Sequence, residues 1–402
     1  MSGPFEGVRV IEVASWTFVP AAGALLADLG ADVIKVEPPQ GDPQRALQNL
    51  LNFGSDGVNP FLEIPNRGKR SMTLDLASEA GRETLLRLIA TADVFLTSYL
   101  PPVRRKLRID VDDLRPANPR LVYVRGSGWG ARGPMADTGG YDLAAAWASS
   151  GTAFKLTPTD GQPPPLMPPG FFDLHGANAI AGAIGTALFQ RERTGHAPVV
   201  DVSLLGVGMW SMGPDIVGAQ FAGSLPSASR TSPGNPIVNC YPTKDERWIY
   251  LVCLQGDRFW PEVCEVIGRP DLITDERFID TPSRFEHREV AVEVLDAVFR
   301  TRTLAEWCDA FANFSGVWAP AISFTELHEH QQVEPNGFLP TVEADGRKAF
   351  RLVGPPAQFD ERPAVPRGPA PELGQDTEAV LLELGLDWDE ITELRERGAT
   401  GA

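Results

Sequence analysis

Short apolar runs alternate with longer helical segments through the first half of the chain, and this alternation constrains the fold more than any other feature. The run Val8–Val13 is rich in β-branched residues, Pro20–Leu29 has the spacing of a helix that Gly30 ends, and Asp32–Val36 is another short run. Two strands joined by a helix in this way run parallel. The chain therefore opens with a β-α-β unit.

The same alternation continues downstream. Further strands are expected at Lys69–Leu76, Asp93–Leu96, Leu121–Arg125 and Val199–Val202. Between them, Ser78 can cap a helix over Glu79–Ala90, and longer helices are expected at Leu174–Gln190 and Ser203–Ala219. This order predicts an α/β fold: a Rossmann-like large domain with a mainly parallel sheet covered on both faces.

A shift to Ser, Pro and Gly between Ser224 and Pro236 indicates a domain boundary. Beyond it, a hairpin at Lys244–Asp245 and helices further on are typical of a smaller α+β domain. These helices are expected near Asp257–Ile267, His287–Phe299 and Leu304–Phe314. A Pro-rich strap, Pro355–Pro371, then leads to two amphipathic helices, Asp376–Leu384 and Asp387–Glu396. We expect a large domain over residues 1–224, completed by 331–402, and a small domain over 225–330.

Composition excludes several classes of partner. The chain has 402 residues with 36 basic and 53 acidic side chains, so its net charge of −17 repels nucleic acid and anionic lipid surfaces. No stretch approaches the roughly 20 apolar residues of a membrane span, and the first residues lack the pattern of a signal peptide. We expect a cytoplasmic protein that binds neither nucleic acid nor membrane.

Metal and NAD sites are not expected either. The four cysteines lie far apart without a C-x-x-C pair, and the five histidines form no H-E-x-x-H pattern. Glu37 ends the second strand about where a ribose-binding carboxylate would lie in an NAD-binding fold. However, the first turn, Ala14–Val19, is bulky where NAD-binding proteins carry G-x-G-x-x-G.

Asp173 is the candidate catalytic residue, because it follows Pro-Pro-Gly-Phe-Phe and begins a helix with a face of small residues. By position it is an N-terminal helix cap, which is worth about 1 kcal/mol. A nucleophilic carboxylate would need burial beside an electrophile. The small face, which includes Gly176 and Gly185, allows another backbone to approach closely.

Several sequence blocks occur in a fixed order along nearly the whole chain. They are Gly7–Val13 (GVRVIEV), Leu26–Glu37 (LADLGADVIKVE), Gly41–Asp42 with Arg45, Asn66–Leu76 (NRGKRSMTLDL), Asn118–Val124, Gly128–Pro134, Gly139–Asp142, Ala187–Gly195 and Tyr241–Asp245. In this order they resemble the class III CoA-transferase family. That family includes formyl-CoA transferase, carnitine CoA-transferases and, on the same fold, alpha-methylacyl-CoA racemase.

The resemblance implies a CoA-transferase that moves CoA between an acyl-CoA thioester and a carboxylic acid. Asp173 matches the family's catalytic aspartate, which would form a mixed anhydride and then an aspartyl-CoA thioester. Backbone N–H groups near Gly170 are expected to stabilise the oxyanions. The resemblance also implies a homodimer whose two chains interlock.

Candidate contacts to CoA follow from the same resemblance. They are Thr17, Phe18, Leu74, Asp75, Leu76, Tyr99, Lys106, Gly128, Trp129 and Tyr141. The chain departs from the family at three positions: Thr17 matches a CoA-contacting glutamine of formyl-CoA transferase, Pro38 matches a phosphate-binding arginine, and Ala77 ends the stretch that is L-D-x-K in the family.

Two alternative functions stay open. A 2-methylacyl-CoA racemase needs a second acid–base group, and Tyr141 occupies the position of the racemase histidine. With a reference pKa near 10, tyrosine is a poor proton acceptor at neutral pH, and His175 is the other candidate. A CoA-ester binding protein without turnover is the second alternative, although Asp173 argues against it.

Overall fold

The computed structural model describes residues 3–47, 58–158, 162–223, 229–344 and 346–401. They form two compact units. The first contains the described residues up to 154, those of 166–223 and those from 331 onward, and the second contains those of 155–165 and 229–330. The boundary expected at residues 224 and 225 lies outside the described residues.

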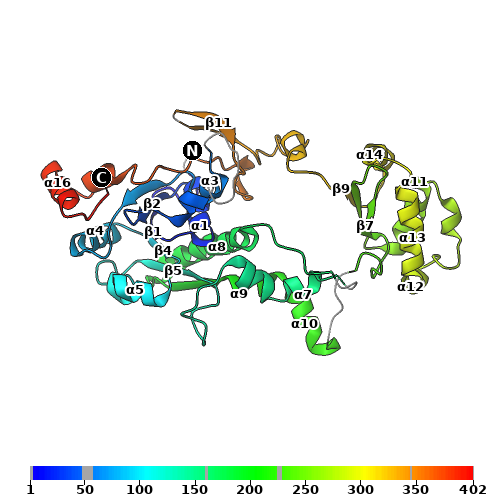
Figure 1. The fold of residues 1–402 in the computed structure, drawn as a ribbon, viewed down its shortest axis with the longest axis horizontal. Helices are drawn as coiled ribbons and strands as arrows, with labels where there is room; N and C mark the ends of the chain where they lie inside the picture. Colours follow the sequence, from blue (N-terminus) through cyan, green and yellow to red (C-terminus); the bar gives the residue numbers. More distant parts are fainter. Residues whose placement is uncertain (1–2, 48–57, 159–161, 224–228, 345, 402) are drawn as a thin grey trace. The chain divides into compact units, whose positions relative to one another are not determined.

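A parallel sheet is the centre of the first unit (Figure 1). Its strands among the described residues are β1 (Arg9–Val13), β2 (Asp32–Glu37), β3 (Arg70–Thr73), β4 (Val94–Thr97), β5 (Val122–Ser127) and β6 (Val199–Ser203). They lie in the order β3-β2-β1-β4-β5-β6, and every neighbouring pair is parallel. The predicted α/β fold is confirmed. Because the order reverses between β1 and β4, the carboxyl ends of these two strands flank the crevice where such sheets bind ligands.

Helices cover both faces of this sheet, since successive strand residues point to opposite sides. On the Val10 face the core is completed by α1 (Phe18–Asp28) and α8 (Phe171–Thr194). On the Ile11 face it is completed by α4 (Glu79–Ala90), α15 (Thr377–Glu383) and α16 (Trp388–Glu396), and Figure 1 shows α16 near α4. Other described helical segments of this unit are η1 (Pro43–Ala46), α3 (Pro60–Asn66), α5 (Pro101–Leu107), α6 (Val111–Leu114), η2 (Leu143–Ala148), α9 (Leu204–Ser211) and α10 (Gly213–Ala222). The short α7 (Thr152–Leu156) spans the sequence junction with the second unit.

Helices α1 and α8 approach closely because glycines make room for one aromatic ring. A Cβ atom on Gly176 would lie 2.3 Å from Cε2 of Phe18, and one on Gly126 would lie 3.0 Å from Cε1 of the same ring. The small-residue face expected on this helix therefore receives Phe18. This packing fixes the start of α1 against the start of α8.

The C-terminal segment covers the open edge of β3. The Ser71 N–H donates to Asp376 Oδ2 and the Asp376 N–H donates to the Ser71 carbonyl, both at 2.8 Å. Further along the edge, the Gly401 N–H donates to Thr73 Oγ1 at 2.9 Å. Before this point the chain forms two small hairpins, β10 (Thr341–Ala344) with β11 (Arg347–Arg351) and β12 (Gln358–Phe359) with β13 (Arg362–Pro363).

The second unit is a small antiparallel sheet packed against helices. Its described strands are β7 (Val238–Pro242), β8 (Trp248–Val252) and β9 (Trp318–Pro320), and its helical segments are α11 (Gly256–Val266), η3 (Pro270–Ile273), α12 (Thr281–Glu286), α13 (Arg288–Phe299), α14 (Leu304–Phe311) and η4 (Glu326–Glu329). Its core is rich in aromatic rings, with Trp260 and Trp307 fully enclosed. The four cysteines are free thiols. Among the described helices, none combines the length and apolarity needed to cross a bilayer.

Two predicted elements differ from the structure. The helix expected over Ser203–Ala219 is two helices, α9 and α10, because the chain breaks at Met212 and Pro214 restarts it. The strand expected over Lys69–Leu76 is reduced to β3, because its neighbour β2 ends at Glu37, opposite Thr73.

Candidate active site

The turn between β1 and α1 carries an unusual backbone conformation at the centre of the site. Trp16 has a φ angle of 70°, in the left-handed region that bulky residues rarely occupy. The Trp16 N–H donates to Asp42 Oδ1 at 3.2 Å. Before it, the Ser15 N–H donates to Ser98 Oγ at 3.0 Å, and that hydroxyl donates back to the Ser15 carbonyl at 3.2 Å. The turn is thus tied to both sides of the sheet's switch point.

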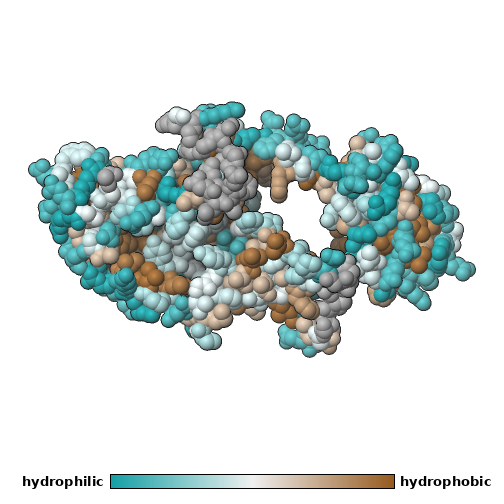
Figure 2. Space-filling model, viewed as in Figure 1, coloured by the Kyte–Doolittle hydropathy of each residue, from teal (hydrophilic) through white to brown (hydrophobic). Residues whose placement is uncertain are grey.

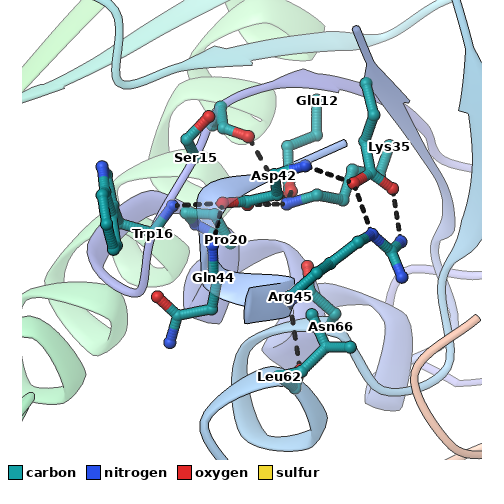
Figure 3. A network of polar contacts seen from close by, with 12 residues as sticks. Glu12, Ser15, Trp16, Pro20, Lys35, Asp42, Gln44, Arg45, Leu62 and Asn66 are labelled. Carbon is teal, nitrogen blue, oxygen red and sulfur yellow. Dashed lines mark hydrogen bonds and ion pairs between the residues drawn. The ribbon is translucent and has the colours of Figure 1, made fainter. Parts of the chain in front are cut away.

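A network of buried charges supports this turn (Figure 3). Lys35 Nζ donates to Asp42 Oδ2 at 2.8 Å and to Glu12 Oε1 at 3.4 Å. Lys69 Nζ donates to both Glu12 oxygens, at 2.7 and 2.8 Å. All four side chains are enclosed, with exposures of 6% or less. Removal of any one of these side chains would lower the stability of the fold, because its charged partner would stay buried with one opposite charge fewer.

Burial and charge act in opposite directions on the pKa values in this network. Burial lowers the pKa of Lys35, but the charges of Asp42 and Glu12 outweigh it and raise that pKa above its ordinary value. Burial dominates at Lys69, whose pKa falls to about 7 although Glu12 opposes the fall.

Asp42 also receives support from Glu37. Burial raises the pKa of Glu37, but hydrogen bonds from Arg45 and the charge of Lys35 outweigh it and lower that pKa to about 2. Glu37 Oε2 then accepts a hydrogen bond from the Asp42 N–H at 3.0 Å. A charge on Glu37 thus holds the loop that carries Asp42.

Tyr141 packs against Trp16. Their ring centroids are 5.6 Å apart and the planes are nearly perpendicular, at 88°. A close backbone approach positions Tyr141, since a Cβ atom on Gly128 would lie 2.8 Å from the Cα of Gly140. The blocks Gly128–Pro134 and Gly139–Asp142 can approach each other this closely because both residues at the contact are glycines.

Asp173 lies in the first turn of α8, as its sequence position suggests, but it forms no capping hydrogen bond. Gly170 is the N-cap residue. Burial and the nearby charge of Asp142 raise the pKa of Asp173 to about 7, and no described residue acts to lower it. The expectation of a simple helix cap is wrong: the carboxylate is a partly buried group without a cationic partner among the described residues.

Asp142 is the buried neighbour of that carboxylate. Its Oδ1 accepts a hydrogen bond from the Leu143 N–H at 2.8 Å, whereas its buried Oδ2 accepts none within the described part of the chain. Burial raises the pKa of Asp142, and the N–H groups of Leu143, Asp173, Gly170 and Phe172 oppose the rise. The N–H groups near Gly170, which are expected to stabilise an oxyanion, thus also act on the Asp142 carboxylate.

Two cavities meet at Asp173. The switch-point cavity, about 340 Å³, lies beyond the carboxyl ends of β1, β4 and β5 and is lined by residues that include Ser15, Phe18, Ser98, Tyr99, Val103, Ser127 and Gly128. The Phe61 cavity, about 480 Å³, is lined by residues that include Thr17, Leu47, Phe61, Ile64, Leu143, Met167 and Leu174. Trp16, Tyr141 and Asp173 belong to the walls of both. Asp173 can therefore contact ligands in either cavity.

The structure brings about half of the expected CoA contacts to these cavities. Phe18, Tyr99, Gly128 and Tyr141 line the switch-point cavity, and Thr17 lines the Phe61 cavity. Trp129 lies beside the switch-point cavity, where its Nε1–H donates to the carbonyl of Gly139, a lining residue, at 3.1 Å.

The other expected contacts line neither cavity. Lys106 is exposed on α5. Leu74, Asp75 and Leu76 follow β3, where the Leu74 N–H donates to the Glu37 carbonyl and the Asp75 N–H donates to the Ala399 carbonyl, both at 2.8 Å. Two of these three backbone donors are therefore already engaged within the protein.

Sequence reasoning gave no role to several residues that build the site. They are Ser15, Trp16, Asp42, Ser98 and Asp142. Asp142 follows Tyr141 in the block Gly139–Asp142, which is one of the blocks that resemble the family. This position was the signal in the sequence that could have indicated a role for Asp142. Asp42 stands with Gly41 in another of these blocks, but the block does not reveal the contact with Trp16, which spans 26 residues.

Comparisons with known proteins show the family to which the chain belongs. The family model described as CoA-transferase family III matches residues 5–377. The chain is 31% identical to (R)-2-hydroxy-4-methylpentanoate CoA-transferase of Clostridioides difficile, over 97% of this chain and 98% of that protein. It is 30% identical to succinate–glutarate CoA-transferase of Agrobacterium fabrum, over 95% of this chain and 96% of that protein.

A solved structure matches as well. The crystal structure of a CaiB/BaiF family protein from Brucella suis has a TM-score of 0.83 and 26% identity, covering 96% of this chain and 100% of that one. The family match and the similarity in fold both extend over nearly the whole chain. The chain belongs to CoA-transferase family III and is an enzyme of the class III CoA-transferase type.

Proposed function

We propose that this enzyme transfers CoA between an acyl-CoA thioester and a carboxylic acid through covalent intermediates on Asp173. The observation that carries the proposal is the position of Asp173 in the wall of both cavities, with a pKa raised to about 7 and no cationic partner among the described residues. A carboxylate of raised basicity without an ion-pair partner is a better nucleophile than an ordinary surface aspartate.

In the first half of the reaction, an Asp173 oxygen attacks the thioester carbonyl and CoA thiolate leaves, giving a mixed anhydride. The thiolate then attacks the aspartyl carbonyl of that anhydride and releases the donor acid as its carboxylate. Asp173 now carries CoA as a thioester. No proton is gained or lost in either step.

The second half reverses these steps with the acceptor. The acceptor carboxylate attacks the aspartyl-CoA carbonyl, the thiolate leaves, and a second anhydride forms. The thiolate then attacks the acceptor's carbonyl and expels the Asp173 carboxylate. Each step takes place at a carbonyl with a good leaving group, which is the gain from covalent catalysis.

In this proposal the switch-point cavity receives the thioester end of CoA. Its position beyond the carboxyl ends of β1 and β4 supports the assignment, because open α/β sheets bind ligands there. The residues proposed to contact CoA are Phe18, Tyr99, Gly128 and Tyr141, with Trp129 beside them. Leu74, Asp75, Leu76 and Lys106 remain proposed contacts for parts of CoA beyond the cavity.

The direct test is Asp173→Asn, which keeps the shape of the side chain but lacks the anionic nucleophile. Transfer between an acyl-CoA and a free acid should fall by about 10⁴-fold or more while the fold survives. Near wild-type transfer in a preparation free of deamidated protein would show that Asp173 is not the nucleophile.

We also propose that the working unit is a homodimer. Helix α10 has no buried residue, and even its large apolar side chain Phe221 is 86% exposed. Trp210 on the preceding α9 is 89% exposed, and Figure 2 displays hydrophobic residues around these helices. Large apolar side chains gathered on a surface are typical of protein interfaces. This apolar surface supports a second copy of the chain as the partner.

A further inference from the structure

The wall of the Phe61 cavity points to the chemical class of acid that the enzyme uses. Class III relatives act on different acids: one of the two named above is called a (R)-2-hydroxy-4-methylpentanoate CoA-transferase and the other a succinate–glutarate CoA-transferase. They are 31% and 30% identical to this chain, so identity does not distinguish the two classes. The distinction must come from the residues that line the cavity.

Apolar side chains dominate this wall. Phe61 and Ile64 come from α3, Leu47 from the end of η1, Leu143 from η2 and Met167 from the segment before α8. Pro60, Pro65 and Pro169 also line the cavity, and proline restricts the backbone that carries these side chains. A hydrocarbon group that enters the cavity leaves water and contacts this apolar surface. Each methylene buried in this way raises the affinity by about fourfold.

No cation among the described lining residues is available to pair with a second carboxylate. The lining residues that the structure describes include neither Lys, Arg nor His, and the charged ones among them are Asp142 and Asp173. The nearby cations belong to the buried network, where Arg45 is held by Glu37 at 2.6 Å and Lys35 by Asp42 at 2.8 Å. Neither of them lines the cavity.

Gln44, a polar residue of the wall, is also engaged. Its amide nitrogen donates to Thr17 Oγ1 at 3.2 Å and to the Phe61 carbonyl at 2.7 Å. Both amide hydrogens are thus used to hold the wall together. A carboxylate at the far end of a dicarboxylic acid would exchange part of its hydration shell for this apolar wall and gain no cationic partner from these residues.

We infer that the Phe61 cavity holds the hydrocarbon body of the acid, and that the enzyme uses monocarboxylic acids with an apolar alkyl or aryl chain in preference to dicarboxylic acids. This inference rests on the proposed function, because the reacting carboxylate must meet Asp173 at the point where the two cavities join. The acid then extends into the Phe61 cavity while the thioester arm of CoA occupies the switch-point cavity.

The test is an identity exchange that needs no knowledge of the natural donor. The purified full chain is incubated with 4-methylpentanoyl-CoA and ¹³C-labelled 4-methylpentanoate, and separately with glutaryl-CoA and ¹³C-labelled glutarate. Mass spectrometry follows the label into the thioester. The exchange of 4-methylpentanoate should have a kcat/KM at least about 100-fold above that of glutarate.

Two failures of this experiment have different meanings. Absence of exchange with every acid tested, including 3-phenylpropanoate, contradicts the proposed function. Exchange of glutarate that equals or exceeds that of 4-methylpentanoate leaves CoA transfer standing and overturns the inference about the acid.

Variants at Ile64 test whether this cavity is the source of the preference. Ile64 is only partly buried, so a longer side chain has room. Ile64→Arg adds a cation to the wall. It should lower the ratio of kcat/KM for 4-methylpentanoate to kcat/KM for glutarate at least about tenfold, because glutarate exchange rises and 4-methylpentanoate exchange falls. Ile64→Gln is the matched control, which should lower 4-methylpentanoate exchange without raising that of glutarate.

An unchanged preference in Ile64→Arg would show that the acid lies elsewhere. If that variant does not fold, Ile64→Ala replaces it and should lower 4-methylpentanoate exchange about tenfold or more through lost apolar contact, while acetate exchange changes less. Equal effects on both acids would again overturn the assignment of the cavity.

Discussion

Asp142 lies close enough to Asp173 for the charge of one carboxylate to raise the pKa of the other. Burial is the larger cause of the rise, and the two together bring the pKa of Asp173 to about 7. Asp142 itself is buried against the start of α8, where N–H groups favour its charged form. Two adjacent carboxyl groups thus have different environments, and the more exposed of them faces both cavities.

This relationship predicts the pH dependence of the reaction. The nucleophile is the ionised form of Asp173, so kcat/KM should rise as the pH increases through about 7 and level off above it. Asp142→Asn removes the like charge but keeps an acceptor for the Leu143 N–H. The acidic limb of the profile should therefore move to lower pH. A limb that does not move, or that moves upward, would show that Asp142 does not control this titration.

The buried charge network predicts a large loss of stability in Asp42→Ala. The substitution leaves Lys35 fully buried, with Glu12 as its remaining carboxylate partner at 3.4 Å, and removes the acceptor of the Trp16 N–H. We expect the free energy of unfolding to fall by about 3–5 kcal/mol in urea denaturation. Glu393→Ala, which breaks an exposed ion pair with Arg397, is the control and should stay near wild type. Equal midpoints for the two variants would contradict this account of the network.

Local signals in the sequence predicted much of the fold. Ser78 caps α4, which spans Glu79–Ala90 as expected, because capping depends on residues a few positions apart. Asp173 also lies in the first turn of α8, although Gly170 is the N-cap residue there.

Long-range contacts explain what the sequence did not predict. The left-handed turn at Trp16 is held by Asp42, and the pKa of Asp173 is raised by burial and by the charge of Asp142, 31 residues earlier in the chain. Neither spacing has a periodicity that a sequence pattern can reveal. The Phe61 cavity likewise combines side chains from α3, η2 and the start of α8, which only the fold brings together.

The site predicts transfer without racemisation. Tyr141, which the resemblance matches to the histidine of the racemases, lies in the cavity wall, so no histidine stands at that position. His175 lines neither cavity, and its Nδ1 lies 2.7 Å from the Phe171 carbonyl. A chiral 2-methylacyl-CoA incubated with the enzyme in deuterated water should keep its α-hydrogen. Rapid deuterium uptake that is lost in both Asp173→Asn and His175→Ala would favour the racemase instead.

The proposed homodimer predicts resistance to dilution. If the two chains interlock, separation requires unfolding, so folded monomers should be absent even at nanomolar protein. Light scattering at higher concentrations, combined with mass photometry at nanomolar protein, measures the mass across this range. A folded monomer that appears progressively on dilution would contradict interlocking.

The central claim is that Asp173 is covalently acylated in each turnover, and oxygen labelling tests it most directly. With an acceptor acid that carries ¹⁸O in its carboxylate, the bridging oxygen of the second anhydride comes from the acceptor and stays with Asp173 when the thiolate attacks. After turnover and proteolysis, mass spectrometry should find ¹⁸O in the side chain of Asp173 and none in that of Asp142. An enzyme that completes many turnovers while Asp173 stays unlabelled would contradict the covalent mechanism.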